Sequence, residues 1–289
     1  MRVLLLGATG SIGTAIARGL VQNGHAVTGL ARSAKSADTI AALGGTPLCG
    51  DLRHPCEWSG VLHKVDAVIH TAATFDSDMG ETDRKVVTEL LKQAKDRSAP
   101  LRFLYTGGCW LYGTTGNRIA DETKVKRPID SFKWMVEQGQ RVLAADGVSG
   151  AIVHPGMVYH EEGGAFARFL EAVRANEPIE VWGGLNTRWP LVHRDDLAQA
   201  YLALLERPEL TGEFNVCAQS GVPVSQIIAE IAQRSGHVSG YVVRTLKYVL
   251  CKHGAMAEGP TLDQQMSAEK IRQLIGWEPE HGCFTTATF

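Results

Sequence analysis

Three glycines spaced three residues apart, Gly7, Gly10 and Gly13, follow directly after the apolar run at residues 3–6. The residues from Thr14 onward are typical of a helix, so the segment predicts a buried strand, a tight turn and a helix. Glycines let the backbone approach a ligand closely, and a helix N-terminus directs N–H groups and its positive dipole end at phosphate. This segment therefore predicts a site for the pyrophosphate of a dinucleotide.

The end of the second predicted strand, at residues 25–31, indicates which nicotinamide cofactor the site takes. A carboxylate there accepts from the ribose 2′-hydroxyl of NAD, whereas a cation suits the 2′-phosphate of NADP. The next residues include Arg32, Ser33 and Lys35 and no acid. A guanidinium fork, a hydroxyl and an ammonium together suit a phosphate dianion. We expect NADP(H) in preference to NAD(H); a solvated basic loop is the alternative.

The elements that must position these residues alternate along the chain. We expect further strands at 46–49, 67–70, 102–106 and 150–154, and helices at 36–43, 83–96 and 131–145. This alternation predicts an α/β fold with a Rossmann-type doubly wound parallel sheet. After residue 155 helices are expected at 165–175, 195–206, 224–235 and 267–275, separated by short strands.

The loosening of the pattern predicts two domains. Residues 1–155 form an NADP-binding Rossmann domain, to which segments near 190–220 return, and residues 156–289 form mainly a smaller C-terminal α/β substrate lobe. Open α/β folds bind ligands at the carboxyl edge of the sheet, which such a lobe covers.

Composition excludes several function classes. The 289 residues include 29 basic and 31 acidic ones, so no charge excess favours nucleic acid or a membrane surface. Apolar residues make up 44% of the chain, and we expect neither a membrane span nor a targeting segment. The six cysteines form no CxxC pair, which favours reduced thiols in a cytoplasmic protein without a metal site.

Several short motifs occur in the order typical of one known group of proteins. They are Gly50-Asp51-Leu52, Thr71-Ala72-Ala73, residues 105–113 (YTGGCWLYG), residues 155–159 (PGMVY), residues 193–198 (HRDDLA) and residues 274–279 (LIGWEP). Together with the GxxGxxG turn, the chain resembles the extended or atypical short-chain dehydrogenase/reductase families, which are relatives of the NAD-dependent epimerases and dehydratases.

This resemblance assigns roles to the cofactor residues. Asp51 and Leu52 would hold the adenine, residues 71–73 would line the pyrophosphate and ribose, and Pro155 with its neighbours would meet the nicotinamide carboxamide. The full expected set is Gly7, Thr9, Gly10, Ser11, Ile12, Gly13, Arg32, Ser33, Lys35, Asp51, Leu52, Thr71, Ala72, Ala73, Thr106, Lys133, Pro155, Gly156 and Val158. The alternatives are a capping role for Asp51 and a purely structural turn at residues 155–156.

The catalytic pattern of these families is broken in this chain. They use a Tyr-x-x-x-Lys pair on one helix, where the ammonium lowers the tyrosine pKa. Lys133 matches the lysine, which leaves Ile129 at the tyrosine position, Gly108 at the serine position and Arg84 at the asparagine position. No tyrosine lies between residues 114 and 158. Lys133 remains able to bind the nicotinamide ribose; an exposed helix lysine is the alternative.

Other side chains are candidates for the missing proton donor. We take Tyr112, Tyr159 and Cys109 as the leading ones beside Lys133, each with a structural or buried role as its alternative. His154, His160 and Asp130 are further candidates.

The second lobe gives a hint about the substrate. Trp182 and Trp189 lie near Arg188 in the sequence, which suggests an apolar face with one polar contact, or simply core packing. We therefore expect an NADP(H)-dependent oxidoreductase acting on a small, largely apolar carbonyl compound or activated alkene. A degenerate NADPH-binding sensor or regulatory protein, or a non-redox lyase or isomerase, is the alternative. A small-molecule partner and a homodimer are expected.

Overall fold

The computed structural model describes residues 1–95 and 97–289. The chain divides into two compact units. The first comprises Met1–Gly107, Trp134–His154 and Leu197–Phe214, and the second comprises Gly108–Lys133, Pro155–Asp196 and Asn215–Phe289. Of the segments near 190–220, residues 197–214 thus return to the first unit, whereas residues 108–133 group with the second. Each unit is described by itself.

The first unit is built on a seven-stranded sheet in the order β11-β6-β5-β4-β1-β2-β3. Its strands are β1 (Arg2–Leu6), β2 (Ala26–Ala31), β3 (Thr46–Cys49), β4 (Ala67–His70), β5 (Leu101–Thr106), β6 (Val148–Pro155) and β11 (Gly212–Val216). Strands β1 to β6 pair in parallel. The order reverses at β1, between β4 and β2, and such a switch point is where open α/β sheets bind ligands. The doubly wound parallel sheet is confirmed.

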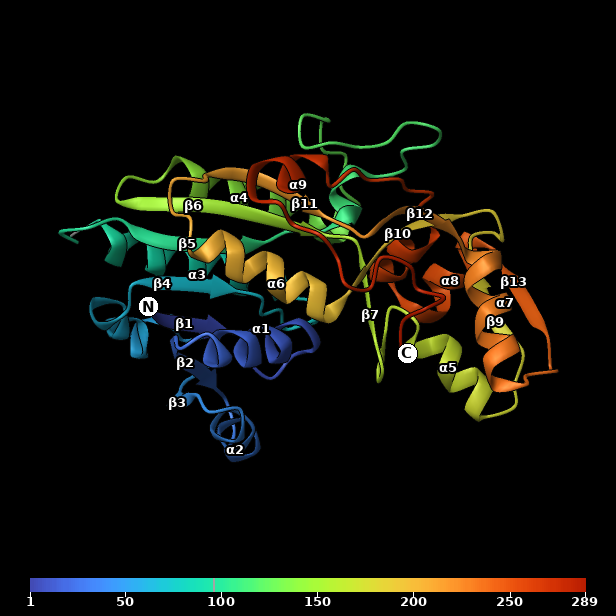
Figure 1. Ribbon diagram of the computed structural model, residues 1–289, viewed down its shortest axis with the longest axis horizontal. Coiled ribbons are helices and arrows are strands. Elements are labelled where there is room, and N and C mark those ends of the chain that lie inside the picture. Colours follow the sequence, from blue (N-terminus) through green and yellow to red (C-terminus); the bar gives the residue numbers. More distant parts are fainter. Residues whose placement is uncertain (96) are drawn as a thin grey trace. The chain divides into compact units, whose positions relative to one another are not determined.

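Helices cover both faces of this sheet, as its parallel strands require. They are α1 (Ser11–Gln22), α2 (Ala34–Ala42), α3 (Met79–Ala94), α4 (Lys133–Ala144) and α6 (Arg194–Leu205). In Figure 1, α1 and α6 lie in front of the sheet, and α3 and α4 lie behind it. Residues 3–6 and 67–69 are fully buried between the helical layers, which explains their continuous apolar runs. Asp96, the last residue of the helix predicted at 83–96, lies outside the described residues.

The second unit contains two small sheets and four further helices. The strands β7 (Met157–His160), β8 (Gly163–Gly164), β10 (Arg188–His193) and β12 (Gln219–Pro223) form a sheet in the order β12-β10-β7-β8, and β9 (Ile179–Trp182) pairs with β13 (Tyr241–Arg244). The helices are α5 (Ala167–Arg174), α7 (Val224–Ser235), α8 (Leu246–His253) and α9 (Glu269–Ile275). Helix α8 was not predicted from the sequence.

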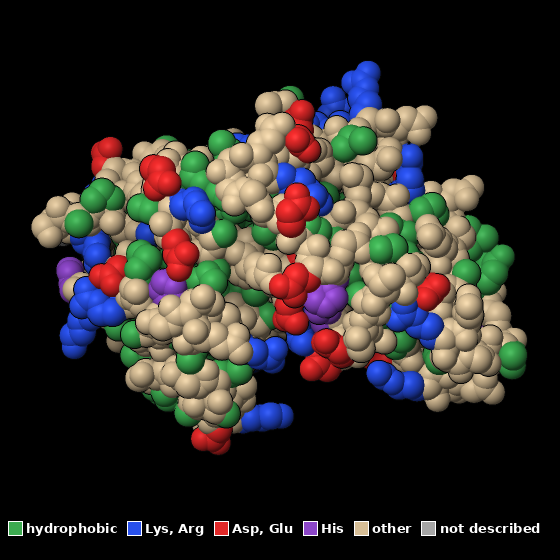
Figure 2. Space-filling view, viewed as in Figure 1, with side chains coloured by type: hydrophobic (Ala, Val, Ile, Leu, Met, Phe, Trp, Pro, Cys, Tyr) green, Lys and Arg blue, Asp and Glu red, His purple; other side chains and the backbone are tan. Residues whose placement is uncertain are grey.

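On the face shown in Figure 2, basic and acidic side chains are interspersed and do not form one large patch of a single charge. None of the helices in residues 1–95 and 97–289 is long and apolar enough to cross a membrane.

Candidate active site

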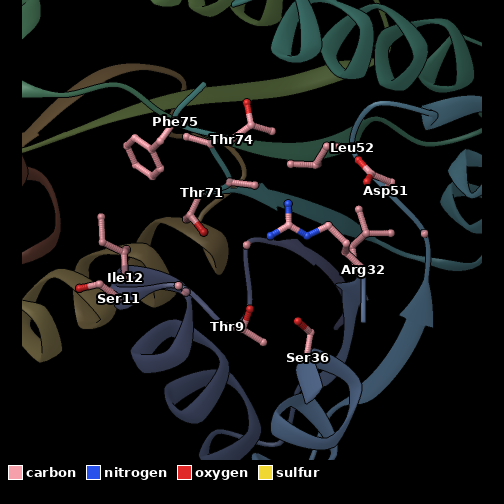
Figure 3. Close-up of a pocket in the computed structure, with 17 residues that line it drawn as sticks. Thr9, Ser11, Ile12, Arg32, Ser36, Asp51, Leu52, Thr71, Thr74 and Phe75 are labelled. Carbon is pink, nitrogen blue, oxygen red and sulfur yellow. The ribbon is translucent and has the colours of Figure 1, made fainter. Parts of the chain in front are cut away.

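A cavity of about 330 Å³ opens in the first unit, at the ends of β1, β2 and β4. Figure 3 shows its labelled side chains, which come from four separate segments of the chain. The lining residues are Gly7, Thr9, Gly10, Ser11, Ile12, Gly13, Leu30, Arg32, Ser36, Gly50, Asp51, Leu52, Thr71, Ala72, Ala73, Thr74 and Phe75. Twelve of the nineteen residues predicted to bind the cofactor are therefore brought together around one cavity.

The glycine turn between β1 and α1 has the backbone geometry of a phosphate cradle. Gly7 has a φ of 90°, which side chains rarely tolerate. A Cβ at Gly13 would lie well inside van der Waals contact with the carbonyl oxygen of Gly7. Gly10 precedes α1 as its N-cap, and the first turn of that helix holds no acidic residue. The helix start therefore presents its positive dipole end to the cavity without a competing carboxylate.

Arg32 supplies a cation to the same cavity. It follows the last residue of β2 and is exposed, and its guanidinium points into the cavity in Figure 3. Within residues 1–95 and 97–289 no carboxylate forms an ion pair with it. An exposed guanidinium without a protein acceptor suits a phosphate group of a ligand.

The two polar neighbours of Arg32 are placed differently from it. Ser33 caps helix α2: its Oγ accepts from the backbone N–H of Ser36 at 3.2 Å. Lys35 lies in the first turn of α2, is exposed and does not line the cavity. Ser36, three residues after Ser33, lines the cavity although neither Ser33 nor Lys35 does. Sequence analysis did not include Ser36 among the expected cofactor residues.

Asp51 lines the cavity while also holding the turn after β3. Its Oδ1 accepts from the backbone N–H of Arg53 at 2.8 Å, and its carbonyl oxygen accepts from the indole of Trp58 at 2.8 Å. Arg53 in turn pairs with Asp76. Asp51 thus lines the cavity and holds a turn, but it caps no helix, because the next helical turn begins at Pro55 after His54.

A buried polar network supports the loop at residues 71–73. The Nε2 of His70 lies 2.9 Å from Oδ1 of Asp83, and the hydroxyl of Tyr105 donates to Asp83 Oδ2 at 2.9 Å. The Nδ1 of His70 accepts from the backbone N–H of Ala72 at 3.3 Å. Burial and the Asp83 carboxylate raise the pKa of Tyr105 far above its ordinary value. Sequence analysis missed this network because its members lie on three separate elements.

Thr74 and Phe75 extend the cavity lining beyond the predicted segment. Phe75 is 69% exposed and has a φ of 54°, a left-handed conformation that costs a bulky residue about 1–2 kcal/mol. No feature of the sequence marked either residue.

The remaining predicted cofactor residues do not line this cavity. In the first unit, the hydroxyl of Thr106 lies 2.6 Å from that of Tyr201. In the second unit, the N–H of Gly156 donates to the carbonyl of Val216 at 2.9 Å, and Val158 pairs with Val192 across β7 and β10. Pro155 is buried at the end of β6. These contacts give Thr106, Gly156 and Val158 partners within the protein, and the cofactor contacts of all four residues stay a prediction.

The serine, tyrosine and lysine positions of the family's catalytic pattern lie in the second unit, and the asparagine position, Arg84, lies in the first. Ile129 is buried at 6% exposure, immediately before a single helical turn. The Nζ of Lys133 lies 2.6 Å from Oδ1 of Asp130, and both side chains are largely exposed. Gly108 has an extended backbone with open space where a side chain would stand. No proton donor stands at position 108 or 129.

The other candidate proton donors are buried. The Tyr112 hydroxyl donates to Oδ1 of Asn215 at 2.7 Å. Burial raises the pKa of the Cys109 thiol to about 12. The Tyr159 hydroxyl has no partner among the described residues, and burial, together with the Asp196 charge, raises its pKa. Burial thus keeps the Cys109 thiol and the Tyr159 hydroxyl protonated at neutral pH, and the Tyr112 hydroxyl is engaged with Asn215.

The remaining candidates are engaged in pairs. His154 lies 3.1 Å from Glu213, and His160 lies 2.7 Å from Glu162. Arg84, at the asparagine position, pairs with Glu81 at 2.6 Å.

The tryptophans of the second unit are packed in its interior. Trp189 is 2% exposed and stacks on Phe169 with centroids 5.7 Å apart, and Trp182 packs against Val249. Arg188 pairs with Asp263 at 2.6 Å. The core-packing alternative thus describes both rings.

Comparison with known proteins places this site in a family. The model of the NAD dependent epimerase/dehydratase family matches residues 3–217. Uncharacterized protein C2A9.02 of Schizosaccharomyces pombe is 27% identical to this chain in sequence. The alignment covers 99% of this chain and 97% of the yeast protein.

Solved structures show the same fold. The human epimerase family protein SDR39U1, crystallised with NADPH, has a TM-score of 0.82 at 20% identity, over 100% of this chain and 98% of that one. UDP-glucuronic acid 4-epimerase of Bacillus cereus, in complex with UDP-glucuronic acid and NAD, has a TM-score of 0.80 at 19% sequence identity. The alignment covers 96% of this chain and 94% of the epimerase. The glycine turn, the switch-point cavity and the family match agree, and the chain belongs to the NAD dependent epimerase/dehydratase family.

Proposed function

We propose that this protein is an NADP(H)-dependent oxidoreductase that acts on a carbonyl compound or activated alkene without the usual Ser/Tyr pair. The observation that carries the cofactor preference is Arg32, whose guanidinium faces the cavity with no carboxylate paired to it among the described residues. The NADPH in the human SDR39U1 structure supports the choice. The NAD in the Bacillus cereus epimerase structure shows that the fold itself does not decide it.

The residues present fit a dinucleotide. The turn at Gly7 and Gly13 leaves room that a Cβ would fill, and the start of α1 offers N–H groups to phosphate oxygens. Asp51 offers a carboxylate to the adenine end, and Arg32 offers its fork to a 2′-phosphate. When bound, the cofactor supplies the hydride. The chain's own task is to bind, orient and exclude water.

The test is a matched titration of the purified protein with NADPH and NADH, followed by nicotinamide fluorescence. We expect NADPH to bind at least tenfold tighter, which corresponds to about 1.4 kcal/mol. Arg32→Ala should remove this preference and leave NADH binding unchanged. Arg18→Ala, which removes an exposed arginine of α1 outside the cavity lining, is the matched control. Equal affinity for both cofactors, or an unchanged preference in Arg32→Ala, contradicts the proposal.

A second candidate function is an NADPH-binding sensor without turnover. It is favoured by Ile129 and Gly108, which carry no proton to donate, by the burial of Cys109 and by the hydrogen bond that engages the Tyr112 hydroxyl with Asn215. Oxidation of NADPH in the presence of a panel of carbonyl compounds and activated alkenes distinguishes the two functions. Because the tryptophans lie in the core, the panel spans polar as well as apolar compounds. Turnover supports the reductase, and tight NADPH binding with no turnover over the whole panel supports the sensor.

The proposed role of Lys133 in holding the nicotinamide ribose has its own test. The lysine pairs with Asp130 and is 67% exposed. Lys133→Met should weaken NADPH several-fold but leave the binding of 5′-AMP, which lacks the nicotinamide ribose, unchanged. Equal losses for both ligands would indicate a structural effect instead.

A further inference from the structure

Two histidines and an aspartate from separate segments of the second unit meet in its interior. His193 ends β10, Asp196 lies in the first turn of α6, and His281 follows α9 in the chain. Each offers one ligand atom, and these atoms lie within 4.8 Å of one another. His193 is 1% exposed and Asp196 is fully buried, and the His281 side chain is 30% exposed although its Nδ1 is buried.

The two imidazoles face each other with nitrogen atoms that have no hydrogen-bond partner. Their ring centroids are 3.9 Å apart. His193 Nε2 and His281 Nδ1 are both buried, and neither makes a hydrogen bond to a described residue, although Asp196 Oδ2 lies 3.4 Å from His281 Nδ1. Buried polar atoms are nearly always satisfied, so two orphaned nitrogens in one cluster require an explanation. A shared electron-pair acceptor provides it; because each lone pair lies in its ring plane, that acceptor must lie at the edge of the two rings, beside Asp196, and not between their faces.

The aspartate is already oriented for such a ligand. Its Oδ1 accepts from the backbone N–H of Glu280 at 2.8 Å, and its Oδ2 accepts from that of His281 at 3.1 Å. Oδ2 also lies 3.4 Å from His281 Nδ1. Each carboxylate oxygen keeps a further lone pair, so Asp196 can hold the chain and coordinate a cation together.

We propose that His193, Asp196 and His281 form a binding site for a divalent transition metal ion of the zinc class. Two imidazoles and one carboxylate are ligands that Zn²⁺ and Co²⁺ accept, with a water molecule completing the tetrahedron. The site differs from what the scattered cysteines led us to expect, because its ligands are histidines that the fold brings together from positions 88 residues apart.

The surroundings supply the outer contacts that a metal-bound histidine uses. His193 Nδ1 accepts a long hydrogen bond of 3.3 Å from the backbone N–H of Asp195, and the Asp195 carboxylate lies 4.0 Å from the same nitrogen. Cation binding at Nε2 requires the ring proton to move to Nδ1; the Asp195 backbone N–H must then release Nδ1, and the Asp195 carboxylate must move closer to accept the proton. The adjacent cation, Arg194, is paired with Glu161 at 3.0 Å and Glu162 at 2.7 Å.

A metal ion here fastens the segment after α9 to the start of α6. That segment is already attached by the indole of Trp277, which donates to the carbonyl oxygen of Asp196 at 3.1 Å. Because the ligands come from distant parts of the sequence, binding stabilises the folded chain and not the unfolded one.

The test uses the full-length protein after removal of metal by a chelator. Addition of Co²⁺ should produce a visible absorption band at one ion per chain, which Zn²⁺ abolishes by competition, and Zn²⁺ should raise the melting temperature. His281→Gln should weaken Co²⁺ binding roughly a hundredfold or more. His63→Gln, which removes an exposed histidine of the first unit, is the matched control and should bind like the wild type.

Cys283, two residues after His281, requires a further control because thiolates also bind these ions. Cys283→Ser should leave the Co²⁺ band unchanged. Absence of a band in the wild type, its survival in His281→Gln, or its loss in Cys283→Ser overturns the proposal.

If His281→Gln does not fold, the metal site can be tested in the wild-type protein alone. Zn²⁺ should then protect His281 from carbethoxylation by diethyl pyrocarbonate and leave His63 reactive. Equal reactivity of His281 with and without Zn²⁺ contradicts the site.

Discussion

Two regions differ in how closely they match the sequence motifs of the family. One is the cavity of the first unit, and the other is the segment at residues 108–133 of the second unit. Around the cavity the pattern lies in the backbone: the left-handed Gly7, the close approach at Gly13 and the start of α1. In residues 108–133 the pattern depends on side chains, and Gly108 and Ile129 stand where the proton-transfer groups are expected. We therefore expect this chain to bind a dinucleotide without the family's usual proton-transfer groups, and the two properties can be tested separately.

The same contrast holds for the polar groups of the two regions. Asp83 lies buried between His70 and Tyr105 and supports the loop that lines the cavity. Asp130 makes its ion pair with Lys133 in solvent. The first region thus depends on buried, satisfied polar contacts, whereas the second can lose its ion pair at little cost.

The largest effect is expected from Gly13→Ala. The added Cβ overlaps the Gly7 carbonyl, so the turn must shift, at a cost of about 1–3 kcal/mol of unfolding free energy. NADPH binding should weaken at least a hundredfold. The control is Gly19→Ala on the same helix, where a Cβ meets nothing within 4 Å, and it should stabilise the protein by about 0.5–1 kcal/mol. Urea denaturation and NADPH titration of both variants test this prediction. If Gly13→Ala binds NADPH as tightly as the wild type, the glycine turn does not hold the phosphates.

The two aspartates should respond differently to amidation. Asp83→Asn replaces a buried carboxylate that faces His70 and Tyr105, and we expect a loss of about 2–3 kcal/mol of unfolding free energy. Asp130→Asn should change it by less than about 0.5 kcal/mol, because its side chain is 88% exposed. Urea denaturation of both variants compares them. Similar losses would show that burial does not distinguish the regions.

Cys109 should react slowly with alkylating reagents. Burial raises its pKa to about 12, so the thiol remains protonated in the folded protein at pH 8. Because the unfolded thiol ionises near pH 8.5, the unfolded chain binds fewer protons above that value, and stability should fall as the pH rises beyond about 9. The exposed Cys49, Cys56 and Cys251 should be labelled first by iodoacetamide, as read by mass spectrometry. Early labelling of Cys109 would restore it as a reactive group.

Sequence reasoning reached the cavity because its main signals are local. Glycine spacing and strand ends fix the backbone at residues 7–13, 51–52 and 71–73, so these segments converge wherever the parallel sheet forms. The helix cap at Ser33 and the network around Asp83 depend on where side chains point, and spacing does not record that. The proximity of His193 and His281 depends on the path of the whole second unit.

The most direct test isolates recognition of the 2′-phosphate from the nicotinamide end. Adenosine 2′,5′-bisphosphate and 5′-AMP differ only in that phosphate, so their affinities can be compared by calorimetry whatever the state of residues 108–133. We predict that the bisphosphate binds at least tenfold tighter to the wild type and that Arg32→Ala makes the two ligands equal. If the wild type binds the bisphosphate and 5′-AMP with equal affinity, the account is contradicted, because the Arg32 guanidinium would then not bind the 2′-phosphate.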